Sequence, residues 1–206
     1  MEVFLNNFKK RFFVSLFSIP IIFSLLNFRF FSNILIFLVY SLSILEWFKL
    51  FKKKSFVFYI GLFILLLSLY SAINFYNNNI NSIYFLWVLT CVWLNDIGGY
   101  VFGKLFGKHK LIRVSPKKTW EGVFGSLFLS QFAFVVLLLQ KNFELSLKIF
   151  FLQFFFSIIS QFGDLLMSYC KRINNIKDSS KFLPGHGGFL DRIDGLLWVL
   201  IFANML

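Results

Sequence analysis

The chain has 206 residues, of which 58% are hydrophobic and 33 are Phe, and its mean hydropathy is +0.76. A soluble domain cannot bury so many apolar side chains, so the composition excludes a water-soluble globular protein. The net charge of +12 is dispersed over short segments between apolar runs, which argues against nucleic acid and favours anionic lipid headgroups and a phosphate-rich substrate as partners.

Apolar segments long enough to cross a bilayer recur along the chain. A hydrocarbon core of about 30 Å needs about 20 helical residues. The sequence therefore predicts an all-α polytopic membrane protein with about seven transmembrane helices, and its first apolar segment is expected to be a membrane helix and not a cleaved signal. The predicted helices are 12–28, 30–48, 55–73, 82–102, 119–139, 147–167 and 189–206.

The last predicted helix is the weakest. After Asp194 only 12 residues remain, Gly195–Leu206, and they reach about 18 Å as a helix. We expect this helix to stop short of the far surface unless its neighbours shield it.

Basic residues separate the connections into two sets. Seventeen Lys and Arg residues lie in one alternate set of ends and loops, and three lie in the other. Because basic residues in short loops stay on the cytoplasmic side, the amino terminus is predicted to lie inside and the carboxyl terminus outside.

Carboxylates are unusually placed in this sequence. Five of the nine acidic residues lie inside or at the cytoplasmic ends of predicted helices, where an ionised carboxylate costs roughly 3 kcal/mol unless a cation, a metal or water compensates. The topology predicts that they lie together at the cytoplasmic ends of the last four helices, in one shared opening (the mouth). Their hard carboxylate oxygens suit Mg²⁺. The alternative is that each one neutralises a nearby Lys or Arg. The five are Asp96, Glu121, Asp164, Asp191 and Asp194.

The first polar segment covers residues 95–122. Thr119 is a good N-cap for the helix that follows, and Glu121 in the first turn suits the helix dipole. Together with Lys117 and Lys118, this helix N-terminus can bind a phosphate, although a basic topology anchor explains the same residues equally well. Three glycines have a spacing that lets another helix or a substrate approach closely, and helix packing is the favoured role: Gly98, Gly99 and Gly103.

The second polar segment covers residues 161–194. Asp164 and Ser168 are four residues apart and therefore share a helix face, where both can supply oxygen to a metal or a phosphate. The glycines of the 184–188 run allow a tight turn whose backbone can approach a phosphate. His186 in this turn is a candidate for substrate contact, whereas a lone His is more often a structural hydrogen-bonding group.

These segments resemble the phosphatidate cytidylyltransferase family. The pattern S-x-x-K-R-x(4)-K-D-x(5)-P-G-H-G-G-x-x-D-R-x-D is met at every position from Ser168 to Asp194. The run S-P-K-K-T-W-E-G at residues 115–122 and the element N-D-x-x-x-Y at residues 95–100 precede it in the expected order. Together these motifs cover about half of the chain.

The resemblance implies an enzyme that condenses CTP with phosphatidic acid to give CDP-diacylglycerol and pyrophosphate in phospholipid biosynthesis. It implies Mg²⁺ as cofactor, and leaves open whether a monovalent cation joins it. The site is expected to face the cytoplasm from the bacterial inner membrane. Residues 1–80 are then N-terminal membrane helices, and 81–206 form the catalytic membrane region with the cytidylyltransferase motifs. The bilayer is a further partner, nucleic acid is not one, and close-packing glycines suggest a homodimer.

The resemblance also implies roles for individual residues. Asp164 and Asp191 correspond to the metal-binding aspartates. The other catalytic candidates are Ser168, Lys171, Arg172 and Asp194. The substrate-binding candidates are Asp96, Ser115, Lys117, Lys118, Thr119, Glu121, Lys177, Asp178, His186, Gly187, Gly188 and Arg192.

Two alternatives stay open at this point. A polyprenol or phytol kinase also uses CTP on a membrane lipid and would share the fold, but it is not expected to keep the full pattern between Lys171 and Asp194. A non-catalytic membrane protein, or an ion-binding transporter, could retain the polar mouth without turnover.

Overall fold

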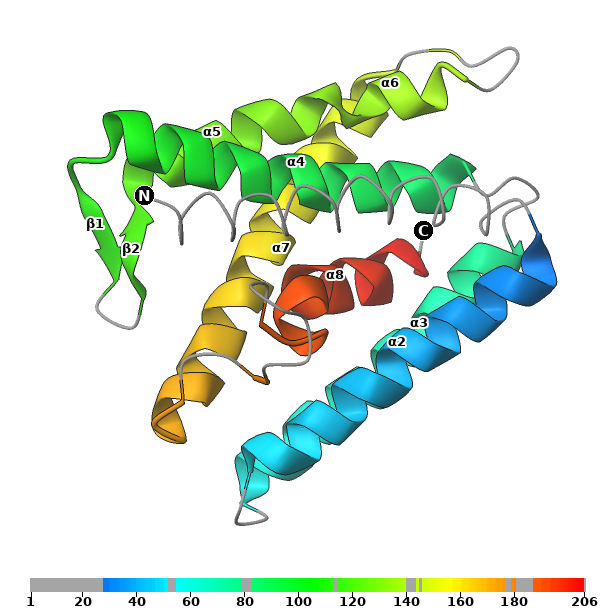
Figure 1. Ribbon diagram of the computed structural model, residues 1–206. Helices are drawn as coiled ribbons and strands as arrows, with labels where there is room; N and C mark the ends of the chain where they lie inside the picture. The colour runs from blue at the N-terminus through cyan, green and yellow to red at the C-terminus, as the bar shows by residue number, and fades with distance from the viewer. Residues whose placement is uncertain are drawn as a thin grey trace, which may run out of the picture.

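The computed structural model describes residues 28–51, 55–78, 83–112, 115–139, 144, 146–176, 179–180 and 187–205. Long helices dominate it, and a two-stranded hairpin interrupts them (Figure 1). The elements are α2 (Arg29–Leu50), α3 (Phe56–Asn78), α4 (Ile83–Phe106), β1 (Lys110–Ile112), β2 (Ser115–Thr119), α5 (Trp120–Ser130), η1 (Gln131–Ala133), α6 (Phe134–Leu137), α7 (Leu147–Ile173) and α8 (Leu190–Ala203).

Five of the described helical segments are long and apolar enough to cross a membrane: α2, α3, α4, the continuous α5–α6 segment (Trp120–Leu137) and α7. The all-α polytopic prediction is confirmed. The number seven is not, because the helix expected at 12–28 lies almost entirely outside the described residues and α8 is a 14-residue helix of about 21 Å. The membrane orientation stays a prediction.

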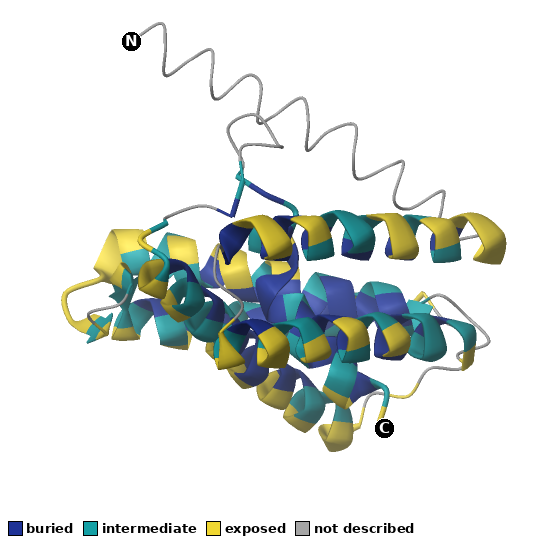
Figure 2. Ribbon diagram, turned by 90° about the horizontal axis from the view of Figure 1, so that it is seen from below, coloured by how far each residue is buried: buried dark blue, intermediate teal, exposed yellow. Residues whose placement is uncertain are grey.

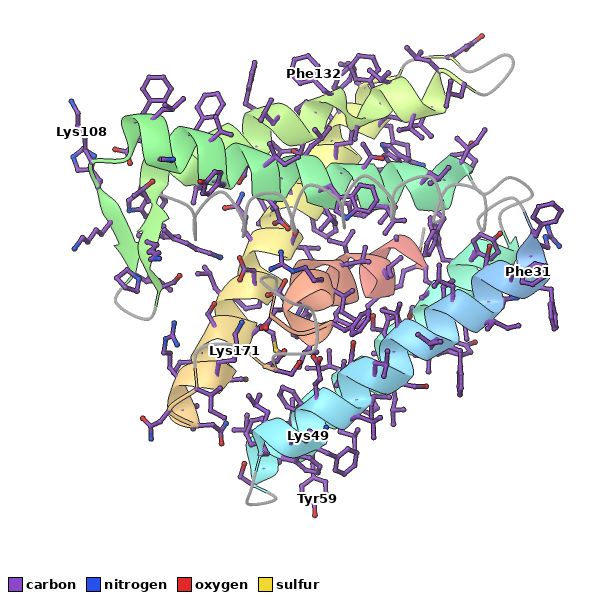
Figure 3. All side chains as sticks on the ribbon, in the orientation of Figure 1. Phe31, Lys49, Tyr59, Lys108, Phe132 and Lys171 are labelled. Atoms are coloured by element: carbon purple, nitrogen blue, oxygen red, sulfur yellow. The ribbon has the colours of Figure 1, made fainter. Side chains whose placement is uncertain are left out.

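Apolar side chains fill the core and also cover much of the outer surface. Figure 2 shows buried residues along the inward faces of the helices and exposed residues along their outward faces. Phe31 on α2 and Phe132 on η1 are 53% and 48% exposed, and both point away from the bundle (Figure 3). Such an apolar exterior is expected where the surrounding solvent is hydrocarbon.

Glycines set the close contact between α4 and α5. A Cβ atom on Gly98 would lie 2.4 Å from the carbonyl oxygen of Gly125, and one on Gly99 would lie 2.8 Å from Ser126 Oγ. The predicted close approach of a second helix is therefore confirmed, and it occurs within the chain. The homodimer stays a prediction, without support from these glycines.

We expect Gly98→Val to destabilise the protein by about 3 kcal/mol, because added atoms meet backbone that cannot yield without separating α4 from α5. The apparent midpoint of thermal unfolding in detergent measures this effect. Ile97→Phe is the matched control, since Ile97 is exposed on the same helix and can accept extra volume. Equal midpoints for the two variants would contradict the proposed role of the glycine contact.

The sequence did not predict the hairpin that joins α4 to α5. In it β1 and β2 are antiparallel, with Lys110 opposite Thr119 and Ile112 opposite Ser115. The N-cap prediction is confirmed, because Thr119 Oγ1 accepts a hydrogen bond from Gly122 N at 3.1 Å. This cap ends the hairpin and starts α5.

Candidate functional site

A buried amide joins the three helices around the site. Asn95 on α4 donates from Nδ2 to Ser160 Oγ at 3.3 Å, and its Oδ1 accepts a hydrogen bond from Ser157 Oγ on the same helix, α7. Its carbonyl oxygen accepts from Ser126 Oγ of α5 at 2.7 Å. Because a buried amide is costly unless it is hydrogen-bonded, this network fixes α4, α5 and α7 relative to one another. Asp96 is the next residue along α4.

Three of the predicted carboxylates lie close together. Asp96 on α4, Asp164 on α7 and Asp194 on α8 are near enough for their negative charges to repel one another. Two cations offset this repulsion: Lys118 at the end of β2 forms an ion pair with Asp164, and both Lys118 and Arg192 lie near Asp96. The arrangement concentrates charge between α4, α7, α8 and the end of β2.

Asp191 lies in a dense set of donors at the start of α8. Its Oδ1 accepts from Lys171 Nζ at 2.7 Å, and its Oδ2 accepts from Ser179 N and Ser179 Oγ at 2.9 Å and from Gly188 N at 3.0 Å. Burial alone raises the pKa of Asp191, but these hydrogen bonds and the Lys171 charge outweigh it and hold the pKa below its usual value. Asp191 is therefore a carboxylate at neutral pH. Lys171, labelled in Figure 3, also lies near Asp194. It therefore links Asp191 to the three carboxylates Asp96, Asp164 and Asp194.

Gly187 and Gly188, just before α8, lie close to the carboxylates of Asp191 and Glu46. Gly187 has a φ of +82°, and a Cβ atom there would lie 2.9 Å from Asp191 Oδ2. A Cβ on Gly188 would lie 2.0 Å from Ser179 Oγ. In the structure the Gly188 amide donates to Asp191 Oδ2 at 3.0 Å. Residues 184–186 lie outside the described residues, and the approach of this turn to a phosphate stays a prediction.

Glu121 lies apart from these contacts. Its Oε1 is 2.7 Å from His109 Nδ1, and its two carboxylate oxygens accept from the His109 amide at 3.2 and 3.3 Å. The pair ties the first turn of α5 to the segment that enters the hairpin. The hydrogen bonds of Glu121 are with His109, whereas Asp164 and Asp191 form their ion pairs with Lys118 and Lys171.

The remaining predicted residues have varied positions. Ser168 Oγ is 3.5 Å from Asp164 Oδ1, as their shared helix face predicts. Arg172 donates to the carbonyl oxygen of Ile176 at 3.0 Å, so it closes the end of α7. Lys117 is exposed on β2, and Ser115 is paired in the hairpin. Three predicted residues lie outside the described residues: Lys177, Asp178 and His186.

The donor set fits Mg²⁺ only in combination with phosphate. Within the described part of the chain, no three His, Cys, Asp or Glu side chains form a group that could hold a metal ion. Mg²⁺ commonly uses one or two carboxylates and takes its other ligands from substrate phosphates and water. Asp164 and Asp191 are such carboxylates, and each is paired with a lysine. When a metal ion takes the place of the lysine at the carboxylate, the lysine becomes available to a phosphate.

Sequence reasoning missed Glu46. This residue lies near the end of α2, is 5% exposed, and contacts the segment that holds Asp191. It interrupts an apolar run within the helix expected at 30–48, so the rule that singled out the other intramembrane carboxylates would also have selected it.

The fold and the site define a polytopic α-helical membrane protein with two lysine–aspartate pairs, each of which includes a residue of α7. Residues 30–206 match the model of the cytidylyltransferase family, and the chain belongs to this family.

Curated relatives resemble a large part of the chain. Proteins named phosphatidate cytidylyltransferase are 46% identical in Staphylococcus haemolyticus and 44% identical in Staphylococcus aureus (strain COL), in each case over 125 residues. These matches cover 60% of this chain and 48% of each relative. The chain therefore spans about half the length of the curated relatives it matches.

Proposed function

We propose that this chain is a CTP:phosphatidate cytidylyltransferase. In the reaction, a phosphate oxygen of phosphatidic acid attacks the α-phosphorus of CTP and forms the new P–O bond. The bond from the α-phosphorus to the oxygen bridging it to the β-phosphorus breaks, and pyrophosphate leaves with that electron pair. The products are CDP-diacylglycerol and pyrophosphate.

The single observation that carries the proposal is the presence of two lysine–aspartate pairs, Lys118–Asp164 and Lys171–Asp191, each of which includes a residue of α7. Nucleotidyl transfer needs positioned charges around phosphorus more than it needs a strong base. Phosphatidic acid is already an anionic nucleophile, so a lysine-rich site with carboxylates suits it. The names of the curated relatives support the same substrates.

We also propose Mg²⁺ as the cofactor, held by Asp164 and Asp191. When bound, the ion would neutralise charge on the triphosphate and on the departing pyrophosphate. The chain's own contribution is to fix both carboxylates: the Asn95 network holds the helix of Asp164, and the donors at Ser179 and Gly188 hold Asp191.

We propose an apolar cavity as the place of the lipid part of the substrate. An apolar cavity of about 260 Å³ lies between α2, α3, α7 and α8, and Trp47, Met167 and Cys170 are among its lining residues. Met167 and Cys170 are the sequence neighbours of Ser168 and Lys171, so an acyl chain in this cavity would leave its phosphate close to the charged groups. We propose that the site faces the cytoplasm, because the ends and loops predicted for that side carry 17 of the 21 Lys and Arg residues.

A single-turnover assay tests the activity. Purified protein in lipid vesicles that contain phosphatidic acid is mixed with Mg²⁺ and CTP labelled at the α-phosphorus. We expect the label to move into the lipid fraction as CDP-diacylglycerol, with one pyrophosphate released for each labelled lipid.

Each other outcome contradicts the proposal in a distinct way. Label recovered in CDP, when a polyprenol or phytol is supplied, would indicate a lipid kinase. Absence of any turnover in protein that is folded and inserted would indicate a non-catalytic protein. Glu144→Gln serves as the active control variant, because Glu144 precedes α7 at the helix end remote from the candidate site.

A further inference from the structure

Glu46 is a buried carboxylate outside the predicted motifs. It is 5% exposed near the end of α2, and none of the ion pairs among the described residues includes it. A buried charge without a nearby cation is costly unless hydrogen-bond donors compensate it. The donors that Glu46 uses therefore indicate what it does.

Four donors from one segment surround Glu46. Its Oε1 accepts from Ser180 Oγ at 2.6 Å and from Phe189 N at 3.1 Å. Its Oε2 accepts from Ser179 Oγ at 3.0 Å and from Leu190 N at 2.9 Å. Each oxygen thus binds one hydroxyl from the start of the 179–190 segment and one backbone amide from its end.

The two amides belong to the N-terminus of α8. Phe189 is the N-cap of this helix, and its side chain supplies no capping hydrogen bond. Amides in the first turn of a helix have no partner within the helix, and a negative charge there is favourable. Glu46 supplies both the acceptors and the charge from a helix more than 140 residues away in sequence.

One hydroxyl connects Glu46 to the candidate site. Ser179 Oγ lies 3.0 Å from Glu46 Oε2 and 2.9 Å from Asp191 Oδ2, so the two carboxylates share its single hydroxyl proton. Gly188 lies between the same groups, since a Cβ atom there would be 2.3 Å from Glu46 Oε2 and 2.0 Å from Ser179 Oγ. Any shift of the Glu46 carboxylate therefore moves the donors that hold Asp191.

We propose that Glu46 is a positioning residue for the site: it fastens both ends of the 179–190 segment to α2 and so fixes Asp191 and its partner Lys171. Its catalytic consequence rests on the proposed function, but its structural consequence does not. Glu46 acts on Asp191 through Ser179 and through the N-terminus of α8.

Glu46→Gln tests the proposal. Gln keeps the length of the side chain and one acceptor oxygen, but its amide NH₂ replaces the other oxygen. That NH₂ group would then face a hydroxyl and a backbone amide that both donate hydrogen bonds in the original protein. We expect amides at Ser179, Phe189 and Leu190 to exchange hydrogen about 10-fold faster or more. Where the cytidylyltransferase activity is present, kcat falls by about 10- to 100-fold, since small displacements of reacting groups have effects of that size, and KM for CTP changes by less than about threefold. Glu46→Ala, which keeps no acceptor, is expected to lose more than Glu46→Gln.

Tyr40→Phe is the matched control. Tyr40 is buried on the same helix and its hydroxyl is 2.6 Å from Ser68 Oγ on α3, so this variant also loses a buried interhelical hydrogen bond. We expect exchange at the α8 N-terminus and kcat within about twofold of the original protein. Should Glu46→Gln fail to fold, Ser179→Ala removes only the bridging hydroxyl and is expected to increase the same local exchange.

The outcomes separate the two proposals. Unchanged exchange at the α8 N-terminus in Glu46→Gln, or equal losses of kcat in Glu46→Gln and Tyr40→Phe, would overturn the positioning role. If the original protein makes no CDP-lipid while Glu46→Gln still loosens the segment selectively, the proposed activity fails and the positioning of Asp191 by Glu46 stands.

Discussion

Asp164→Asn is expected to lower the rate of CDP-diacylglycerol formation by about 1,000-fold. Asp164 is the carboxylate at which Lys118 forms its ion pair and Ser168 Oγ lies 3.5 Å away, with Asp96 and Asp194 close by. An amide has nearly the same shape but no charge, so it can neither hold a divalent cation nor keep Lys118 in place. The measurement is the initial rate of label transfer from CTP to lipid with saturating substrates.

Glu144→Gln is the matched control for this loss, because it makes the same chemical change at an exposed acid outside the site. Membrane insertion should be unchanged in both variants, and Glu144→Gln should also keep the apparent unfolding midpoint. A rate for Asp164→Asn within threefold of the original would remove Asp164 from the proposed site.

Lys171→Met is expected to reduce both activity and stability. The Lys171 and Asp191 side chains are 11% and 10% exposed, and their charged atoms are 2.7 Å apart. Removing the lysine leaves a buried carboxylate without its cation, which typically costs about 3–5 kcal/mol. The apparent unfolding midpoint in detergent should fall by roughly 10 °C, given the usual relation between free energy and midpoint for a chain of this size.

Two further variants separate charge pairing from general damage. Lys104→Met removes an exposed lysine from the last turn of α4, and a change below about 0.5 kcal/mol is expected. The double variant Lys171→Met with Asp191→Asn should recover part of the stability, because no unpaired charge remains, while activity stays lost. A double variant less stable than Lys171→Met alone would show that the pair is not the source of the effect.

Much of the fold could be predicted from the sequence because the rules involved are local. A helix that crosses hydrocarbon must be apolar over about 20 residues, so α2, α3, α4, α5–α6 and α7 were each expected near their observed positions. The Thr119 cap was predictable for the same reason, since cap and amide are three residues apart. The hairpin was not predictable, because its strands have only three and five residues, too few for a periodic pattern to be recognised.

The candidate site divides in the same way. The motifs alone identified Asp164, Lys171 and Asp191 as site residues, because carboxylates near hydrocarbon need compensation and the spacing of these residues resembles a known family. The identity of each partner was not available from the motifs. Lys118 and Asp164 are 46 residues apart, and only the contact of the hairpin with α7 pairs them.

What the sequence determined by itself is the membrane class of the protein, its helices and the residue types of its site, since hydropathy, periodicity and spacing act along the chain. What only the tertiary structure decided is which polar groups meet: Glu121 with His109, Lys171 with Asp191, and Glu46 with the first amides of α8. The physical reason is that a hydrogen bond depends on distances of about 3 Å, and packed helices set those distances between residues that are remote in sequence.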